Sequence, residues 1–368
     1  MMKLDYQQAL LDRNQAARAD RAGQLRWVLQ DLAGTADQPE QDPRTHLRTA
    51  LEWLCHAQDM AGNGSVSAGW RFKSGWLPGN TETTGWLIET CLPAAYCLAW
   101  PSLGSRAHAM LDVLMSQPDE HTPGKIHGLI AGHVHTGRTD CLDHALHSGQ
   151  SLKALPIQSV AHQAQVAQAL AALMVRTGDD LFRRQAQQNL EAILICQTPC
   201  GWFSDTGSPV ATSLLSAIIH SLIELSVLLA DERALRAARK AALAMRNRLS
   251  ELGSLSGAYD DGWTTAARHV CVKGLAQMAV CWLRLSQLEQ NSEWREPAWR
   301  ALSWIKRNQR SASHEMTPGL VLPNSVPIWR GPNAFGFDTL NAKYFSDALM
   351  MDMMGITVPS AAKTRTDS

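Results

Sequence analysis

The chain has 368 residues, enough for one large domain or two medium ones, and its 34 basic residues balance its 34 acidic residues. Balanced charge argues against a nucleic-acid-binding protein, because such proteins usually carry a strongly basic surface. The sequence shows neither an apolar secretion signal nor a run of about 18 apolar residues that would span a membrane. We therefore expect a soluble, cytoplasmic protein with no membrane span.

Residues 1–44 are expected to form a polar, helical extension, and helical periodicity dominates from residue 45 onward. Helices that are apolar on nearly all sides alternate with helices that carry a charged stripe. The apolar helices are expected at 83–99, 160–176, 211–230, 268–288 and 340–354, and the striped helices at 45–58, 105–117, 181–197, 232–249 and 294–310. Residues 357–368 are expected to form a disordered tail.

This alternation predicts an all-α fold in which an inner ring of buried helices is wrapped by an outer ring. Such a fold is an α/α toroid, here a barrel of about six helical hairpins that spans residues 45–356. A two-layer α-solenoid would give a similar pattern. Solenoids need capping repeats at their ends, and the absence of such repeats favours the closed ring.

Connections from an outer helix to the next inner helix are long, whereas the reverse connections have only a few residues. In a toroid all connections of one kind lie on one rim, so the long loops should gather over one mouth of the ring. They are expected at 59–82, 118–159, 198–210, 251–267 and 311–339. Because functional residues concentrate on loops that a rigid scaffold holds, we predict the functional site on that rim.

The rim loops carry aromatic and cationic side chains of the types that bind sugars. Tryptophans recur at a similar position after the outer helices, which predicts a stacking cleft, although a single such tryptophan usually belongs to the core. Arginines can hold a carboxylate or phosphate through paired hydrogen bonds. The candidate substrate-binding residues are Trp70, Arg71, Trp76, Trp202, Trp263, Arg268, His269, Trp329, Arg330, Asn341 and Lys343.

Glu82 is the leading candidate for acid–base chemistry, because it lies where a long loop enters an expected inner helix. Its carboxylate has an alternative role as a cap for that helix. Tyr259 and Asp260 are the second candidates, since a tyrosine beside a carboxylate can act as an acid or a base. The alternative there is an ordinary Asp-Asp-Gly turn above a packed tyrosine.

Residue types that bind metals are present without a recognised motif. The eight cysteines are scattered and form no CxxC pair, so we expect buried, reduced thiols. Six histidines fall within 118–159, which we interpret as a loop, and His133, His135 and Asp140 have ligand-like types. No HExxH motif accompanies them. We expect a polar loop rather than a metal site, and no cofactor.

Three segments resemble the bacterial polysaccharide-biosynthesis proteins of the VpsJ type. They read ETTGW at 82–86, GAYDDGW at 257–263 and NAKYFSDAL at 341–349. The resemblance covers most of residues 46–354, and 118–165 depart from it. It implies a fold similar to six-hairpin glycosidases and terpenoid cyclases, and a role in producing exopolysaccharide or another cell-surface glycan.

The leading hypothesis is a glycan-active protein that binds a polysaccharide or oligosaccharide in a cleft at one mouth of the toroid. If it is an enzyme, we expect a lyase, an epimerase or a glycoside hydrolase acting on a chain that contains uronic acid. The alternative is a non-catalytic sugar-binding or scaffold component that works with other polysaccharide-assembly proteins. Terpenoid or prenyl chemistry is disfavoured, because the chain lacks the acidic DxDD motif.

Overall fold

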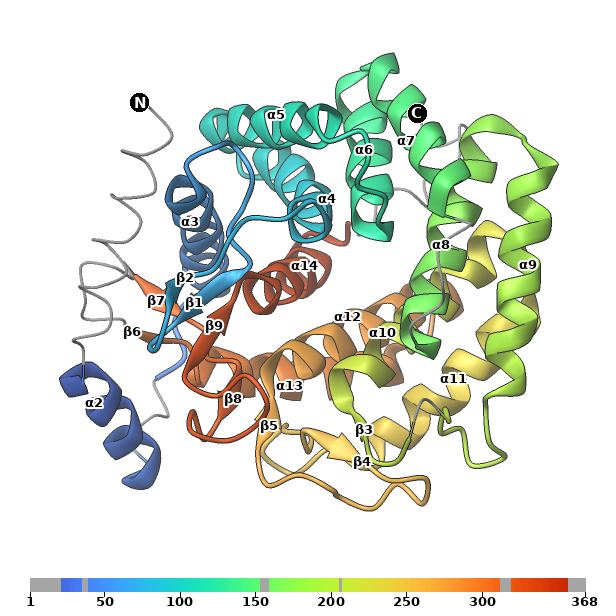
Figure 1. The fold of residues 1–368 in the computed structure, drawn as a ribbon. Coiled ribbons are helices and arrows are strands. Elements are labelled where there is room, and N and C mark those ends of the chain that lie inside the picture. Colours follow the sequence, from blue (N-terminus) through green and yellow to red (C-terminus); the bar gives the residue numbers. More distant parts are fainter. Residues whose placement is uncertain (1–20, 35–38, 153–158, 205–206, 312–318, 357–368) are drawn as a thin grey trace.

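The structure is a computed structural model that describes residues 21–34, 39–152, 159–204, 207–311 and 319–356. Within these residues, six outer and six inner helices alternate along the chain and form a ring (Figure 1). The outer helices are α3 (Pro43–Ala61), α5 (Pro101–Ser116), α7 (Thr139–Leu152), α9 (Asp180–Ile195), α11 (Glu232–Arg246) and α13 (Arg295–Arg307). The inner helices are α4 (Thr81–Cys97), α6 (Pro123–Thr136), α8 (Val160–Thr177), α10 (Thr212–Leu228), α12 (Val272–Glu289) and α14 (Thr339–Met354).

The ring of inner helices is closed. Each inner helix packs against the next one in the chain, and the last, α14, packs against the first, α4. The first outer helix, α3, also covers α14, so the beginning and the end of the ring share one interface. Closure makes the fold an α/α toroid, as the sequence predicts, and excludes the open solenoid.

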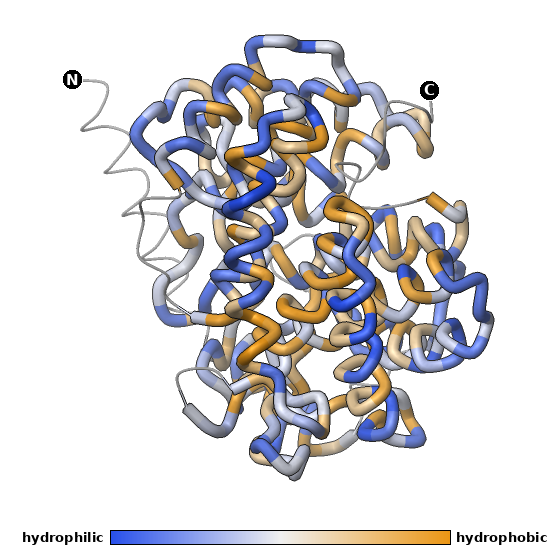
Figure 2. The backbone as a smooth tube through the Cα atoms, turned by 90° about the vertical axis from the view of Figure 1, so that its right-hand side faces the viewer, coloured by the Kyte–Doolittle hydropathy of each residue, from blue (hydrophilic) through white to orange (hydrophobic). Residues whose placement is uncertain are grey.

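Burial separates the two rings as the hydropathy pattern predicts. The inner helix α10 buries side chains on all sides, including Leu215, Ile219 and Leu222. The outer helix α11 buries a single stripe made of alanines and Met245, while its arginines face outward. Figure 2 shows outer helices on which hydrophilic and hydrophobic residues alternate along the tube, as expected for helices with one buried face.

The expectation of a single loop over 118–159 is wrong. This stretch contains the hairpin of α6 and α7, which completes the sixth pair of helices. Its glycines are placed four residues apart on α6 and allow close packing: a Cβ at Gly128 would lie 2.7 Å from the Cα of Gly85 on α4. The glycines therefore form a helix–helix contact, and they do not mark a flexible segment.

The long connections gather on one rim, where short antiparallel strands join them. β1 (Gly69–Arg71) pairs with both β2 (Gly75–Trp76) and β9 (Gly336–Asp338). The other pairs are β3 (Val210–Ala211) with β4 (Ala258–Tyr259), β5 (Val270–Cys271) with β8 (Ser325–Val326), and β6 (Arg310–Ser311) with β7 (Leu320–Val321). A 3₁₀ turn, η1 (Ser292–Trp294), leads into α13. Three of these pairs, β1–β9, β3–β4 and β5–β8, join loops distant in sequence, so the rim is a connected structure.

The described part of the N-terminal extension packs against this rim. In α2 (Arg21–Leu32), the buried ring of Trp27 meets Phe337 edge-on, with ring centroids 5.0 Å apart. Asp31 at the end of α2 pairs with the buried guanidinium of Arg310 and accepts the backbone N–H of Ile328 at 2.6 Å. The division into an extension, a toroid and a tail stays a prediction, and the expected tail at 357–368 lies outside the described residues.

Candidate functional site

Two adjoining cavities lie at the rim where the inner helices begin. Their volumes are about 410 Å³ and 220 Å³, and Ser213 and Lys273 line both. The larger cavity contains first-turn or capping residues of five inner helices, from α4 to α12, and Glu82 contributes the only carboxylate among its described lining residues. We call the two cavities together the rim cleft.

Glu82 is held in this cleft by two neighbours. One carboxylate oxygen accepts the indole N–H of Trp86 at 2.7 Å, and the other accepts the backbone N–H of Gly124 at 2.8 Å. Its own helix is instead capped by Asn80, whose side chain accepts the N–H of Thr83. The carboxylate of Glu82 thus does not cap α4, and it is anchored to the first turn of the neighbouring helix α6.

Close packing of α4 on α6 explains this anchoring. A Cβ on Gly85 would overlap the carbonyl group of Gly124, and a Cβ on Gly124 would lie 2.8 Å from both a carboxylate oxygen of Glu82 and the ring of Trp86. Only glycines permit the two helices to approach so closely. The segment ETTGW therefore positions its glutamate through the glycine three residues later.

Two imidazoles share the larger cavity with Glu82. Burial lowers the pKa of His162 below its ordinary value, although the nearby charge of Glu82 partly opposes this. Burial also lowers the pKa of His121, with the charges of Lys125 and His147 acting in the same direction. Near neutral pH both rings are therefore uncharged and able to donate and accept hydrogen bonds.

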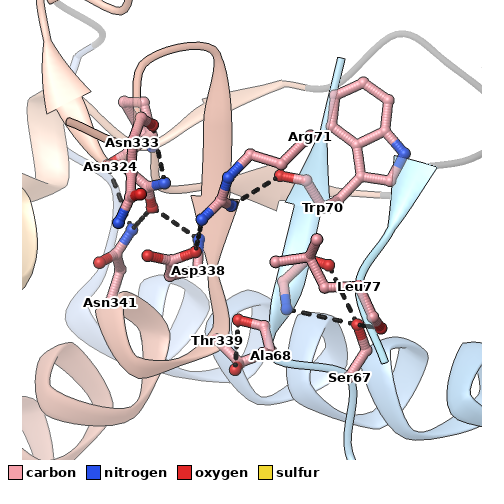
Figure 3. A network of polar contacts seen from close by, with 12 residues as sticks. Ser67, Ala68, Trp70, Arg71, Leu77, Asn324, Asn333, Asp338, Thr339 and Asn341 are labelled. Carbon is pink, nitrogen blue, oxygen red and sulfur yellow. Dashed lines mark hydrogen bonds and ion pairs between the residues drawn. The ribbon is translucent and has the colours of Figure 1, made fainter. Parts of the chain in front are cut away.

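The smaller cavity is walled by a network of amide side chains (Figure 3). Asn341 donates to the side-chain oxygen of Asn324 at 2.8 Å, and the same oxygen accepts the backbone N–H of Asp338 at 2.7 Å. Asp338 also pairs with Arg71 across the β1–β9 contact at 2.6 Å. His269 lies between Gly257 and Gly331, and burial and Arg330 lower its pKa. This wall is polar, and the only carboxylate among its described residues, that of Asp338, is neutralised by Arg71.

Below the rim cleft, a buried polar cluster fills the interior of the ring. His127 on α6 stacks on Trp86 with ring centroids 4.8 Å apart, and its Nδ1 lies 3.1 Å from a carboxylate oxygen of Glu89. Lys343 on α14 pairs with Asp347 at 2.7 Å and lies 5.8 Å from the centre of the Trp86 ring. Trp86 therefore connects the interior cluster to the carboxylate of Glu82.

The structure gives the predicted stacking cleft a different role, because four of its five tryptophans are buried. Trp70, Trp76, Trp202 and Trp263 are at most 6% exposed, and Trp329 alone is half-buried. The rings pack on other aromatic side chains: Trp76 lies 4.9 Å from Trp53. These four rings belong to the hydrophobic core beneath the rim loops. None of them exposes a face on which a ligand could stack.

Tyr259 and Asp260, the second pair of catalytic candidates, both form hydrogen bonds within their own loop. Tyr259 is 1% exposed, its hydroxyl accepts the N–H of Ser256, and burial raises its pKa. Asp260 accepts the backbone N–H groups of Gly262 and Thr264, which is the turn that the sequence left open as the alternative. Neither residue lines the rim cleft.

The remaining binding candidates divide between the cleft and the rest of the molecule. His269 and Asn341 line the smaller cavity, while Lys343 is buried below it in the ion pair with Asp347. Arg71 lines a third cavity of about 710 Å³ beside the β1–β2 turn, which adjoins the smaller cavity at Pro332 and Asn333. Arg268 and Arg330 are exposed and line neither cavity of the rim cleft.

Sequence reasoning missed several residues of the cleft, namely His121, His162, Gln165, Ser213 and Lys273. All but His121, which precedes α6, stand in the first two turns of inner helices, next to the long loops and not on them. A histidine three residues after the N-cap Ser159 is a weak local signal, which the sequence offered at His162.

Within the described residues, no group of His, Cys, Asp and Glu side chains is arranged to hold a metal ion. No described helix is long and apolar enough to cross a bilayer.

No protein-family model matches the chain, and no curated protein sequence matches it either. Solved structures do match. The unsaturated glucuronyl hydrolase from Bacillus sp. GL1, described as responsible for the degradation of glycosaminoglycan, is 13% identical with a TM-score of 0.73, covering 86% of this chain and 98% of that chain. This chain has the fold of the unsaturated glucuronyl hydrolases.

Two further hydrolases of this kind support the same conclusion. One, described as specific for heparin, is 10% identical with a TM-score of 0.71, covering 85% of this chain and 98% of that chain. The other is a variant from Streptococcus agalactiae complexed with dGlcA-GalNAc6S, 11% identical with a TM-score of 0.69, covering 88% and 98%. The expected six-hairpin glycosidase-like toroid is confirmed, whereas membership of the VpsJ-type family is not.

Proposed function

We propose that the protein is an enzyme that acts on a uronic-acid-containing glycan in the rim cleft, with Glu82 as the group that transfers a proton. The observation that supports this most strongly is the placement of Glu82. Its carboxylate is half-buried, fixed by two hydrogen bonds, and faces a cavity of about 410 Å³ at the mouth of a toroid. One protein of this fold, the Streptococcus agalactiae variant described above, has an oligosaccharide bound.

The environment of Glu82 suits acid–base catalysis. Each carboxylate oxygen accepts one hydrogen bond from the protein, so each keeps a further lone pair for a sugar hydroxyl or a water molecule. The backbone N–H of Gly124, in the first turn of α6, fixes the direction in which the carboxylate faces the reacting molecule. The uncharged rings of His121 and His162 supply hydrogen bonds to sugar hydroxyls beside it.

Hydrolysis is the reaction that we favour among those open to a toroid of this kind. The similar structures are named as hydrolases, and a fixed carboxylate can take a proton from the attacking water molecule and return it to the sugar oxygen that leaves. The burial of four rim tryptophans argues against a surface specialised for sugar binding alone. A role in bacterial exopolysaccharide or cell-surface glycan production remains part of this proposal and rests on sequence resemblance. The cytoplasmic location expected from the sequence also remains a proposal.

The test compares the wild type with Glu82→Gln on oligosaccharides prepared from glycosaminoglycans, with products followed by mass spectrometry. We expect the variant to bind the same oligosaccharides with turnover reduced by about 100-fold or more, as for loss of an acid–base group. Glu52→Gln, on the exposed face of α3, is the matched control and should keep full turnover. Equal turnover by Glu82→Gln would refute the assignment. Binding without any product from the wild type would instead support a non-catalytic sugar-binding protein.

A further inference from the structure

Lys273 stands at the junction of the two cavities of the rim cleft. It is the second residue of α12, it is half-buried, and it lines both the larger and the smaller cavity. No acidic side chain within the described residues forms an ion pair with it. Within the described residues, this half-buried cation thus faces two cavities without a counter-ion, and it can pair with an anion that enters either of them.

The backbone around Lys273 adds positive potential to that of its side chain. Gly274 permits α12 to approach α10 so closely that a Cβ there would lie 2.8 Å from the backbone nitrogen of Ser213. The N-cap residues of these helices, Ala211 and Cys271, make no side-chain capping hydrogen bond. Two helix N-termini, each with partial positive charge, are thus packed side by side at a lysine. A cation is disfavoured at such a place unless an anion joins it.

Neither of the described carboxylates that line the cleft forms an ion pair with Lys273. Glu82 accepts hydrogen bonds from Trp86 and Gly124 at the α4–α6 contact. Asp338 in the smaller cavity pairs with Arg71 at 2.6 Å. Within the described residues, no carboxylate that lines these cavities is therefore paired directly with Lys273.

We propose that Lys273 determines specificity by binding an anionic substituent, a carboxylate or a sulfate ester, on a sugar unit that spans the two cavities. This inference rests on the proposed glycan-directed function and names the substrate class for the same site. In this arrangement the glycosidic bond of the anionic unit lies in the larger cavity, next to Glu82. The smaller cavity, with its amides and the uncharged ring of His269, receives the hydroxyl groups of a neighbouring uncharged unit.

The experiment measures binding by calorimetry to three tetrasaccharides of one backbone. The first is unsulfated chondroitin, which carries carboxylates; the second is its carboxyl-reduced, neutral form; the third is the carboxyl-reduced form with 6-sulfate. The variants are Lys273→Gln, which removes the charge, and Lys273→Arg, which keeps it. Lys73→Gln is the matched control, since this exposed lysine lines the neighbouring cavity beside Arg71 and neither cavity of the rim cleft.

We expect the wild type to bind at least one anionic tetrasaccharide roughly 10- to 100-fold more tightly than the neutral one, as for a hydrogen bond to a charged group. Lys273→Gln should abolish this preference without weakening binding of the neutral form, whereas Lys273→Arg should keep most of it and Lys73→Gln all of it. The anionic form that gains affinity identifies carboxylate or sulfate as the substituent.

The proposal is overturned if Lys273→Gln weakens neutral and anionic forms equally, if it changes neither, or if the wild type shows no anionic preference or no binding. These outcomes are separate from failure of the proposed function. A preference for anionic forms that depends on Lys273, with no turnover of any of them, would retain the binding role and refute catalysis. Turnover that depends on Glu82, with no effect of Lys273→Gln on the anionic preference, would retain catalysis and refute the binding role of Lys273.

Discussion

The carboxylate of Glu82 and the backbone N–H of Gly124 are 2.8 Å apart, and they belong to two different inner helices. This contact makes the position of the candidate acid–base group depend on how closely α4 and α6 pack. The distance between the helices is in turn set by glycines on both sides of the crossing. Stability and function should therefore respond together to changes at this crossing.

Gly85→Ala should destabilise the protein and reduce turnover. The added Cβ would overlap the carbonyl group of Gly124, so the two helices must move apart, at a cost of about 1–3 kcal/mol or more in the free energy of unfolding. Gly104→Ala on α5 is the matched control, since its nearest neighbour would be 3.7 Å away, and there we expect a gain of about 0.5–1 kcal/mol from helix propensity. Urea unfolding measures both. Equal effects of the two substitutions would contradict the packing argument.

Trp86→Phe should lower turnover much more than stability. The substitution removes the indole N–H that donates to Glu82 at 2.7 Å but keeps an aromatic ring against His127. We expect kcat to fall by roughly 10- to 100-fold, as for loss of a hydrogen bond to a charged group, with KM little changed. Trp282→Phe removes an indole N–H that donates to the carbonyl of Ala242, far from the cleft, and should leave kcat unaltered. Steady-state kinetics and thermal unfolding of both variants test this, and an unchanged kcat in Trp86→Phe would show that the hydrogen bond is dispensable.

The ring architecture was predictable from sequence because hydropathy alone separates buried helices from striped ones. The α6–α7 hairpin was missed because its glycines and histidines resemble a loop in composition. The structural role of these glycines depends on the helix against which they pack, and the sequence of α6 alone does not reveal that helix. Gly128 faces Gly85, some forty residues earlier in the chain. Spacing of Gly124, Gly128 and Gly132 at every fourth residue was the available signal, since it places them on one helix face.

The candidate site was predictable only in part, for a related reason. The position of Glu82 at the rim was predictable because it enters a helix from a long loop, and that relation is local in sequence; its catalytic role stays a prediction. The burial of Trp70 and Trp76 was not, because loop tryptophans face either solvent or core according to how the loops pair. Lys273 was missed because its importance arises from the contact of α12 with α10 at Gly274, which is a tertiary feature.

His220 should make stability fall as the pH is lowered. Burial, followed by the charges of Lys343, His127 and Arg284, lowers its pKa to about 3, compared with 6.5 for the exposed group. As the pH drops below 6.5, the unfolded chain binds a proton that the folded protein does not, so the folded state loses stability progressively until about pH 3. Between pH 7 and pH 5 the loss from this residue is about 2 kcal/mol.

The variant His220→Gln cannot titrate and should lose about 2 kcal/mol less than the wild type when the pH falls from 7 to 5. Urea unfolding at both pH values gives the four free energies that are needed. His108→Gln, at an exposed position on α5, controls for the removal of a histidine. The assignment fails if the wild type and His220→Gln lose equal amounts of stability over this range.

The buried ion pair of Arg284 with Glu224 joins α12 to α10 and should show strong coupling between its partners. The two side chains are 8% and 0% exposed, with a nitrogen–oxygen distance of 2.8 Å. Arg284→Met leaves the carboxylate buried without its partner, which should lower the free energy of unfolding by about 3–5 kcal/mol. The double variant with Glu224→Leu removes the stranded charge and should recover most of that loss.

An exposed pair provides the comparison for this double-mutant cycle. Arg236 and Glu232 on α11 lie 3.3 Å apart with side chains 62% and 88% exposed, so water screens their attraction. Arg236→Met should therefore change the free energy of unfolding by less than about 1 kcal/mol. Urea unfolding of the single and double variants measures the coupling at both sites. If Arg284→Met costs no more than Arg236→Met, or if Glu224→Leu adds a further loss instead of restoring stability, the buried pair does not contribute in the way that its burial implies.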